Sequence, residues 1–483
     1  MKRQVLSLLL TALLLASCSK TGTPTETSSD SSGVSETAPE TIDISPQIPA
    51  VDYEGYTFSI LTTGIAENET AYHEVYSEGQ TGEAVNDAVY ARNMAIAEKY
   101  NITMEGIYTG LFDYSTFTKA VVAGDDVYDV IMPNQMSAMQ FAGNGYLQEI
   151  TSIPYLDFTK PWWLENSVSE TSLYGRNFFA VGDMNLASWE STPVLFYNKD
   201  MAASYNVDNL YTVVDAGKWT YDTMLAYCSN VSTDLNGNGE FDADDAYGLA
   251  LNSFSVYTMT YGGGFRLIDR DADDLPVIDL SEDFITFMQR HIQECNNNPA
   301  IMNGDKLGKG DVLLGVALRK TAFQENRVLF YNEMLTIAST LREMETDFGV
   351  LPMPKSSEAQ EQYYSFFHKS NSSTIAVPVT SVEPERIGSV IEDMQYQSHL
   401  LVRPAYLEST VKGKVMRDME SERMLDLVLS NIIFDTVLDP GILDACRPLF
   451  NTANENLMSE LAGKMNTFEK TLQEYIDAIQ PNA

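Results

Sequence analysis

The sequence predicts an α/β protein with two lobes, on three observations. Strand-like and helix-like segments alternate between residues 56 and 132, an order typical of a parallel sheet covered by helices. The same mixture returns in the second half of the chain. The roughly 430 residues that follow the N-terminal region are also too many for one hydrophobic core, because domains commonly hold about 50 to 250 residues.

The first lobe should begin with a strand at 56–61, where β-branched and aromatic residues lie between two glycines. A helix should follow at 83–100, where apolar residues recur at helical spacing. A strand at 102–107, a helix at 117–122 and a buried strand at 128–132 complete this unit.

The second half should contain a long extended stretch at 178–198. Thr220 is a suitable N-cap for a helix at 220–230. The other elements expected are strands near 247–251, 328–331 and 348–351 and, from about residue 383 onward, mainly helices, including one at 416–433.

The N-terminus has the pattern of a lipoprotein signal peptide. Lys2 and Arg3 precede an apolar run at 5–15, which is too short to cross a membrane, and small residues lie directly before Cys18. We predict that residues 1–17 are removed and that Cys18 carries lipid, including palmitate, at the extracellular face of the cell membrane. The alternative is ordinary secretion, with Cys18 incidental.

Residues 18–50 are predicted to be the lipidated N-terminus and a disordered linker, because they contain almost no large apolar side chain. The net charge of −38 argues against nucleic acid as a partner and against adsorption to anionic lipid. The three remaining cysteines allow at most one disulfide; they are Cys228, Cys295 and Cys446.

An acidic loop at 234–245 fits the spacing of a calcium-binding loop. The expected ligands are Asp234, Asn236, Asn238, the carbonyl of Glu240, Asp242 and Asp245. Gly239 permits the sharp turn that such a loop needs. Asp245 replaces the usual Glu, and strand-like residues follow, so a pair of EF-hands is not expected. An acidic Asn-Gly turn without metal is the alternative.

Six segments together resemble extracellular solute-binding proteins of ABC importers, in the group related to maltose-binding protein. They are 82–93 (GEAVNDAVYARN), 128–131 (YDVI), 160–163 (KPWW), 195–199 (LFYNK), 218–221 (KWTY) and 348–355 (FGVLPMPK). The resemblance covers the chain from about residue 52. It implies a periplasmic-binding-protein-like fold of two α/β lobes, with a hinge and a ligand cleft between them.

The resemblance also implies that each lobe is discontinuous in sequence. The chain should cross between the lobes at about 180–192 and return at about 371–377. The lobe boundaries expected from these crossings are 51–185 with 372–425 for lobe 1, and 186–371 with 426–483 for lobe 2.

Aromatic side chains are candidates for a sugar-binding cleft, because their flat faces stack against sugar rings. Trp189 is the strongest candidate, since it lies in a polar stretch at the expected crossing. The other candidate contacts are Glu190, Tyr261, Arg266, Asn134 and Trp163. A place in the core is the alternative for each of the aromatic residues.

We expect a binding protein and not an enzyme, because the sequence lacks a nucleophile elbow, a phosphate loop and a zinc-hydrolase motif. The expected function is capture of a small solute, foremost an oligosaccharide, for an ABC permease, by a monomer bound to the membrane through its lipid. An extracellular polysaccharide-degrading enzyme and a surface sensor or adhesion module are the alternatives.

Overall fold

The computed structural model describes residues 44–64, 73–341, 344–408, 419–435, 441–451 and 457–480. The predicted signal peptide, Cys18 and most of the predicted linker lie outside the described residues. Among the described residues, no helix combines the length and the apolar character that a membrane span requires.

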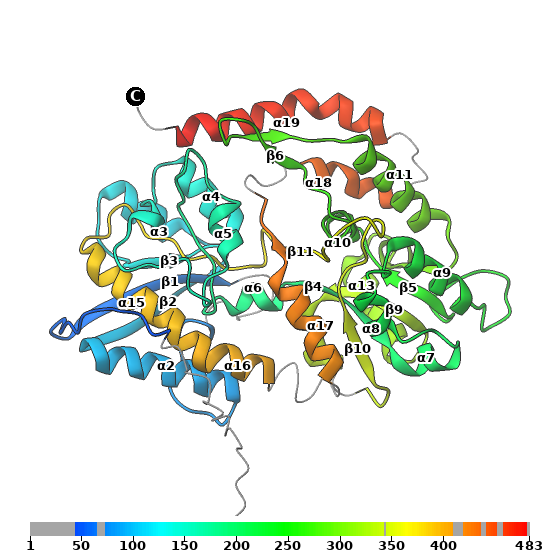
Figure 1. Ribbon diagram of the computed structural model, residues 1–483, viewed down its shortest axis with the longest axis horizontal. Coiled ribbons are helices and arrows are strands. Elements are labelled where there is room, and N and C mark those ends of the chain that lie inside the picture. The colour runs from blue at the N-terminus through cyan, green and yellow to red at the C-terminus, as the bar shows by residue number, and fades with distance from the viewer. Residues whose placement is uncertain are drawn as a thin grey trace, which may run out of the picture. The chain divides into compact units, whose positions relative to one another are not determined.

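The first half of the chain forms the predicted parallel sheet (Figure 1). Its elements are β1 (Tyr56–Gly64), α2 (Ala84–Tyr100), β2 (Ile102–Leu111), α3 (Ser115–Ala123) and β3 (Val130–Met132). β1 lies between β2 and β3, and its apolar side chains Ile60 and Leu61 are almost completely buried. The predicted strand–helix–strand–helix–strand order is therefore confirmed.

Local signals account for the bounds of α2. The Glu83 carboxylate accepts a hydrogen bond from the Asn86 N–H at 2.9 Å and so caps the first turn. Asn101 takes the left-handed conformation at the other end, with φ 47°. Val89 and Ile96 bury the inner face of the helix.

A second sheet has five strands in the order β10-β4-β9-β5-β8. They are β4 (Pro193–Asn198), β5 (Tyr247–Leu251), β8 (Ile301–Asn303), β9 (Val328–Met334) and β10 (Phe348–Leu351). β4 runs antiparallel to both of its neighbours, whereas β5 is parallel to β8 and β9. The predicted strands near 247–251, 328–331 and 348–351 are confirmed.

Helices and two small sheets complete the fold (Figure 1). The helices up to residue 341 are α4 (Gln135–Gly143), η1 (Ile150–Ser152), α5 (Glu165–Ser169), α6 (Leu186–Glu190), α7 (Lys199–Ser204), α8 (Leu210–Asp215), α9 (Tyr221–Val231), α10 (Ser255–Gly262), α11 (Glu282–Asn297), α12 (Gly304–Leu307), α13 (Val312–Gln324), η2 (Leu335–Ile337) and α14 (Ala338–Leu341). The later helices are α15 (Pro384–Gln397), the π-helix η3 (Ser398–Val402), α16 (Arg403–Ala405), α17 (Met419–Ser430), α18 (Ile442–Cys446), η5 (Arg447–Asn451) and α19 (Leu457–Ile479). The small sheets pair β6 (Ile268–Arg270) with β7 (Pro276–Ile278), and β11 (Ser365–Phe366) with β12 (Ile432–Ile433).

Two expectations about elements were wrong. The stretch 178–198 is not extended throughout, because α6 forms before β4, and the Ser191 N–H and hydroxyl both donate to the Ala187 carbonyl. The helix expected at 416–433 ends at Ser430, and Ile432 and Ile433 pair with β11 instead. In both places a tertiary partner overrides the local pattern: β11 pairs with β12, and the Glu74 carboxylate accepts a hydrogen bond from the Ala187 N–H of α6 at 2.8 Å.

The segments expected to cross between the lobes pair with each other. Ala180 and Ile375 form an antiparallel bridge, and Ala376 pairs with Ile131 of β3. The Ser188 hydroxyl donates to the Ser373 carbonyl at 2.8 Å. Residues 185 to 195 positions apart in sequence thus lie side by side, although the exact lobe boundaries remain a prediction.

Candidate ligand-binding site

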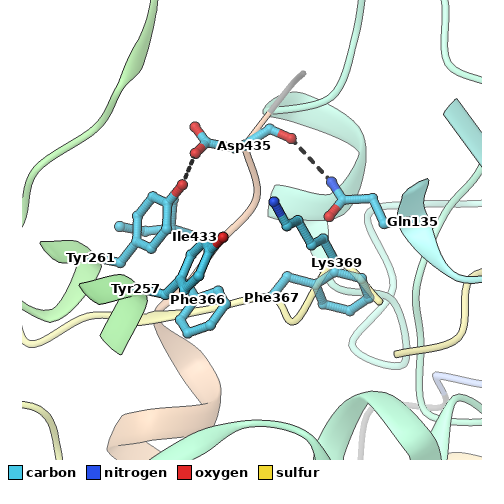
Figure 2. A pocket seen from close by; sticks show the side chains of 8 residues that line it. All are labelled: Gln135, Tyr257, Tyr261, Phe366, Phe367, Lys369, Ile433 and Asp435. Atoms are coloured by element: carbon cyan, nitrogen blue, oxygen red, sulfur yellow. Dashed lines mark hydrogen bonds between the residues drawn. The ribbon is translucent and has the colours of Figure 1, made fainter. Parts of the chain in front are cut away.

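A stack of aromatic rings forms the floor of the candidate site (Figure 2). Tyr257 and Tyr261 lie four residues apart on α10 and therefore project from the same face of the helix. Both rings stack on Phe366 of β11, with centroids 5.9 and 5.3 Å apart. Phe254, just before α10, stacks on His368 at 5.0 Å. These rings together offer flat apolar faces.

Hydrogen-bonding groups border the Tyr261 end of this floor (Figure 2). The Tyr261 hydroxyl donates to the Asp435 carboxylate, and the Gln135 amide donates to the Asp435 backbone carbonyl at 3.0 Å. Gln135 begins α4, whereas Asp435 follows β12. The border therefore joins residues from the two halves of the fold.

Charged groups border the Tyr257 end. The Lys369 ammonium lies 5.2 Å from the centroid of the Tyr257 ring and 3.3 Å from a carboxylate oxygen of Asp444. The Tyr257 hydroxyl also donates to the Asp444 carboxylate, and the Arg447 guanidinium lies 3.7 Å from the same carboxylate. Two cations and one carboxylate are thus held at this end.

Two adjoining pockets share Tyr257, Phe366 and Lys369. The inner pocket reaches Gln135 and Asp435 and has a volume of about 20 Å³, which is room for about one water molecule. The outer pocket reaches Phe254, His368 and Arg447 and has a volume of about 250 Å³. A ligand larger than water can enter the inner pocket only if the protein moves.

Burial changes the protonation of two groups in the site. Desolvation raises the pKa of Asp435 to about 7, although the hydrogen bond from Tyr261 acts in the opposite direction. Burial lowers the pKa of His368 to about 3, so its ring is neutral at physiological pH. The site can therefore both donate and accept hydrogen bonds beside its aromatic faces.

Of the six predicted ligand contacts, Tyr261 lines the inner pocket. Asn134 caps α4, accepting a hydrogen bond from the Ser137 N–H at 2.8 Å, and precedes the lining residue Gln135. Arg266 pairs with Glu170 at 2.8 Å. Neither Asn134 nor Arg266 is among the residues that line the two pockets.

The other three predicted contacts lie away from these pockets. Trp163 is buried and donates to Glu392 at 2.9 Å. Trp189 lies on α6 with only 3% of its surface exposed, and the Arg403 guanidinium is 5.2 Å from its ring. Glu190 ends the same short helix. A ligand role for these six residues remains a prediction.

Sequence reasoning missed most of the lining residues, because they come from segments far apart in the chain. These residues are Gln135, Phe254, Tyr257, Phe366, Phe367, His368, Lys369, Ser370, Asn371, Ile433, Asp435, Asp444 and Arg447. One local signal was available, since Tyr257 precedes Tyr261 by one helical turn. No comparable spacing connects Asp435 with α10.

The acidic loop at 234–245 wraps around its first and last predicted ligands. The two carboxylate oxygens of Asp234 accept hydrogen bonds from the N–H groups of Gly237 and Gly239 at 2.7 and 2.8 Å. Gly239 has φ 84°, which confirms its expected turn. The carboxylate of Asp245 accepts from Leu235 and Asp242 at 2.9 and 2.8 Å.

The oxygen donors of this loop suit a hard cation such as Ca²⁺. Its carboxylates are nevertheless held by backbone N–H groups, and nowhere in the described part of the chain do three His, Cys, Asp or Glu side chains gather closely enough to hold a metal. β5 follows the loop directly, as the strand-like residues predicted.

Two sheets joined by paired crossing segments, with an aromatic pocket bordered by both halves, define a two-lobe α/β fold. Residues 77–298 match the profile of the family described as bacterial extracellular solute-binding protein. This match covers less than half of the chain and agrees with the resemblance that the six sequence segments indicate.

Solved structures share the fold at low sequence identity. An ABC substrate-binding protein of Listeria monocytogenes in complex with cycloalternan has 13% identity and a TM-score of 0.56, covering 87% of this chain and 100% of its own. An ABC transporter solute-binding protein of Thermotoga lettingae bound with α-D-tagatose has 14% identity and a TM-score of 0.52, covering 88% and 100%. The maltose/maltodextrin-binding domain of Bdellovibrio bacteriovorus bound to maltotriose has 11% identity and a TM-score of 0.50, covering 88% and 98%. No curated protein sequence matches the chain significantly.

Proposed function

We propose that this protein captures a carbohydrate, foremost an oligosaccharide, at the pocket between α10, β11 and β12 and delivers it to an ABC permease. The aromatic floor carries this proposal. Ring faces of Tyr257, Tyr261 and Phe366 suit the C–H faces of sugars, while Asp435 and Lys369 suit their hydroxyls. The sugars bound by the structural neighbours support the same class of ligand.

The proposed mechanism is capture by closure. The inner pocket has room for about one water molecule, so a sugar ring can enter only from a more open state. Contacts to residues of both lobes form only after closure, so the ligand shifts the population toward the closed form. Gln135 on α4 and Tyr261 on α10 are examples of such contacts, one from each half of the fold.

Removal of the Tyr261 ring is expected to weaken sugar binding by at least about tenfold, because both ring stacking and the hydroxyl partner of Asp435 are lost. A glycan library screened by thermal shift would identify the sugar, and calorimetry would compare Tyr261→Ala with the parent. Tyr205→Ala is the matched control, since Tyr205 is exposed and lies outside the lining. Equal affinities for the two variants would place the sugar elsewhere.

The same proteins distinguish the other two functions. A polysaccharide-degrading enzyme would release product from a glycan that it binds, whereas a binding protein leaves the glycan intact. A sensor or adhesion module would leave sugar uptake unchanged when its gene is deleted, whereas the proposed importer component would not.

We further propose that calcium binds the 234–245 loop as a structural ion. The oxygen donor set and the turn at Gly239 support this proposal. When bound, the ion would supply cross-links between the two ends of the loop through Asp234 and Asp245. Extracellular loops of this kind bind calcium at about 10⁻⁴ to 10⁻³ M, so external calcium can fill them.

EGTA is expected to lower the melting temperature of the parent protein, because it removes an ion that binds only the folded loop. Asp234→Ala should remove this dependence on calcium. Asp244→Ala is the control, because Asp244 occupies a loop position that supplies no ligand, and it should keep the dependence. If neither EGTA nor added calcium changed the melting temperature of the parent protein, the assignment of calcium to this loop would be wrong.

A further inference from the structure

The C-terminal helix α19 belongs to two hydrophobic cores at once. Leu457, Leu461 and Phe468, in its first half, pack in the cluster that contains Leu249 of β5 and Phe330 of β9. A different set of side chains occupies the second half, namely Leu472, Ile476 and Ile479, and these pack in the cluster that contains Leu61 of β1 and Ile131 of β3. One continuous helix therefore joins the cores of the two sheets.

The contacts of the second half are specific to α4 and its neighbours. The Arg176 guanidinium donates to the Ile479 carbonyl at 3.2 Å. Tyr475 and Ala478 lie so close to Gly143 at the end of α4 that a Cβ atom placed there would be 3.7 and 3.8 Å from them. Figure 1 shows α19 running from above α18 and α11 to above α4.

The β6–β7 hairpin forms a second connection next to this helix. Its residue Ile278 packs against both clusters. Arg270 donates to the carbonyls of Glu170 and Ser172 at 3.0 and 2.8 Å, and Arg266 pairs with the Glu170 carboxylate at 2.8 Å. Glu170 also accepts from the Phe434 N–H at 2.7 Å, directly before the pocket residue Asp435.

We propose that α19 and the β6–β7 hairpin form a strap that limits the separation of the two lobes, so that access to the pocket requires release of the second half of α19 from α4. A helix of 23 residues cannot stretch. Any wide opening of the lobes therefore pulls Leu472, Ile476 and Ile479 away from the cluster that contains Leu61 and Ile131. Release of this half-helix controls how far the cleft opens.

This proposal concerns the motion of the lobes and not the identity of the ligand, so its test uses no sugar. Spin labels at Val122→Cys on α3 and Leu313→Cys on α13 would report the distance between the lobes, since both positions are 70% exposed. The three internal cysteines are buried, and the mature chain would carry Cys18→Ser. Double electron–electron resonance spectroscopy then gives the distribution of distances between the two labels.

Leu472→Asp is expected to shift this distribution to longer distances, because it places a charge in the contact with α4. Thr471→Asp adds the same charge one residue earlier, at an exposed position, and should leave the distribution unchanged. Identical distributions for the parent and both variants would overturn the strap, since detachment would then have no effect on opening.

A cross-link tests the same strap without a destabilising charge. Gly143→Cys with Ala478→Cys places two Cβ atoms at the separation of a disulfide. Oxidation should slow amide hydrogen exchange in the pocket segment 365–369 relative to the reduced form of the same protein. Equal exchange in both forms would overturn the proposal, even if Leu472→Asp failed to fold.

Discussion

At the scale of single residues, the buried carboxyl of Glu392 shows the role of the predicted candidate Trp163 and of its neighbour Trp162. The indole N–H groups of Trp162 and Trp163 donate to its two oxygens at 3.1 and 2.9 Å, and the Asp157 N–H donates at 3.4 Å. Burial nevertheless raises the pKa of Glu392 to about 7. The two tryptophans therefore supply hydrogen bonds to a buried carboxyl in the core.

Glu392→Gln is expected to flatten the dependence of stability on pH. The unfolded carboxyl has a pKa near 4.3, so between about pH 4.3 and 7 the native state holds a proton that the unfolded state has lost. Stability therefore falls as pH rises through this window, by at most about 1.4 kcal/mol per pH unit. Urea unfolding from pH 5 to 8 would measure the slope, with exposed Glu385→Gln as the control. A slope equal to that of the parent would contradict the assignment.

The sequence identified residue types better than residue positions. Tyr261 lies in the pocket, but Trp189 lies in the core beneath Arg403. The local sequence around an aromatic residue does not indicate whether its side chain points into the core or toward a pocket. Asp435 was missed because its neighbourhood is made by α10 and α4, which are distant in sequence.

At the scale of elements, local signals were sufficient where a helix has its own cap. Thr220 precedes α9 and accepts a hydrogen bond from the Thr223 N–H at 3.2 Å, as predicted. The strands at 247–251 and 348–351 were also located from composition alone. By contrast, α6 and β12 depend on partners from elsewhere in the chain, so local patterns mispredicted both.

Thr220→Ala is expected to lower the free energy of unfolding by about 1 kcal/mol, because the first turn of α9 loses its cap. Chemical denaturation would show this as a lower midpoint with an unchanged slope. Thr220→Ser keeps the hydroxyl and should recover most of the loss. Equal destabilisation by both variants would assign the effect to packing of the methyl group instead.

At the scale of the whole molecule, the net charge and the predicted lipid should act on membrane association in opposite directions. The chain has 68 acidic and 30 basic residues, so anionic lipid headgroups repel its folded part. No helix in the described ranges can span a bilayer. The predicted lipid at Cys18 would contribute about 0.8 kcal/mol for each CH₂ group that enters the bilayer.

Cys18→Ser is therefore expected to move the protein from the membrane fraction to the supernatant of fractionated cells, where an immunoblot would detect it. The parent should stay with the membranes in about 1 M salt, because high salt screens charge but leaves acyl chains buried. Release of the parent by salt alone would indicate electrostatic adsorption despite the charge of −38. Retention on membranes of a Cys18→Ser protein that has lost residues 1–17, as judged by its mass, would show that a contact other than lipid anchors the chain.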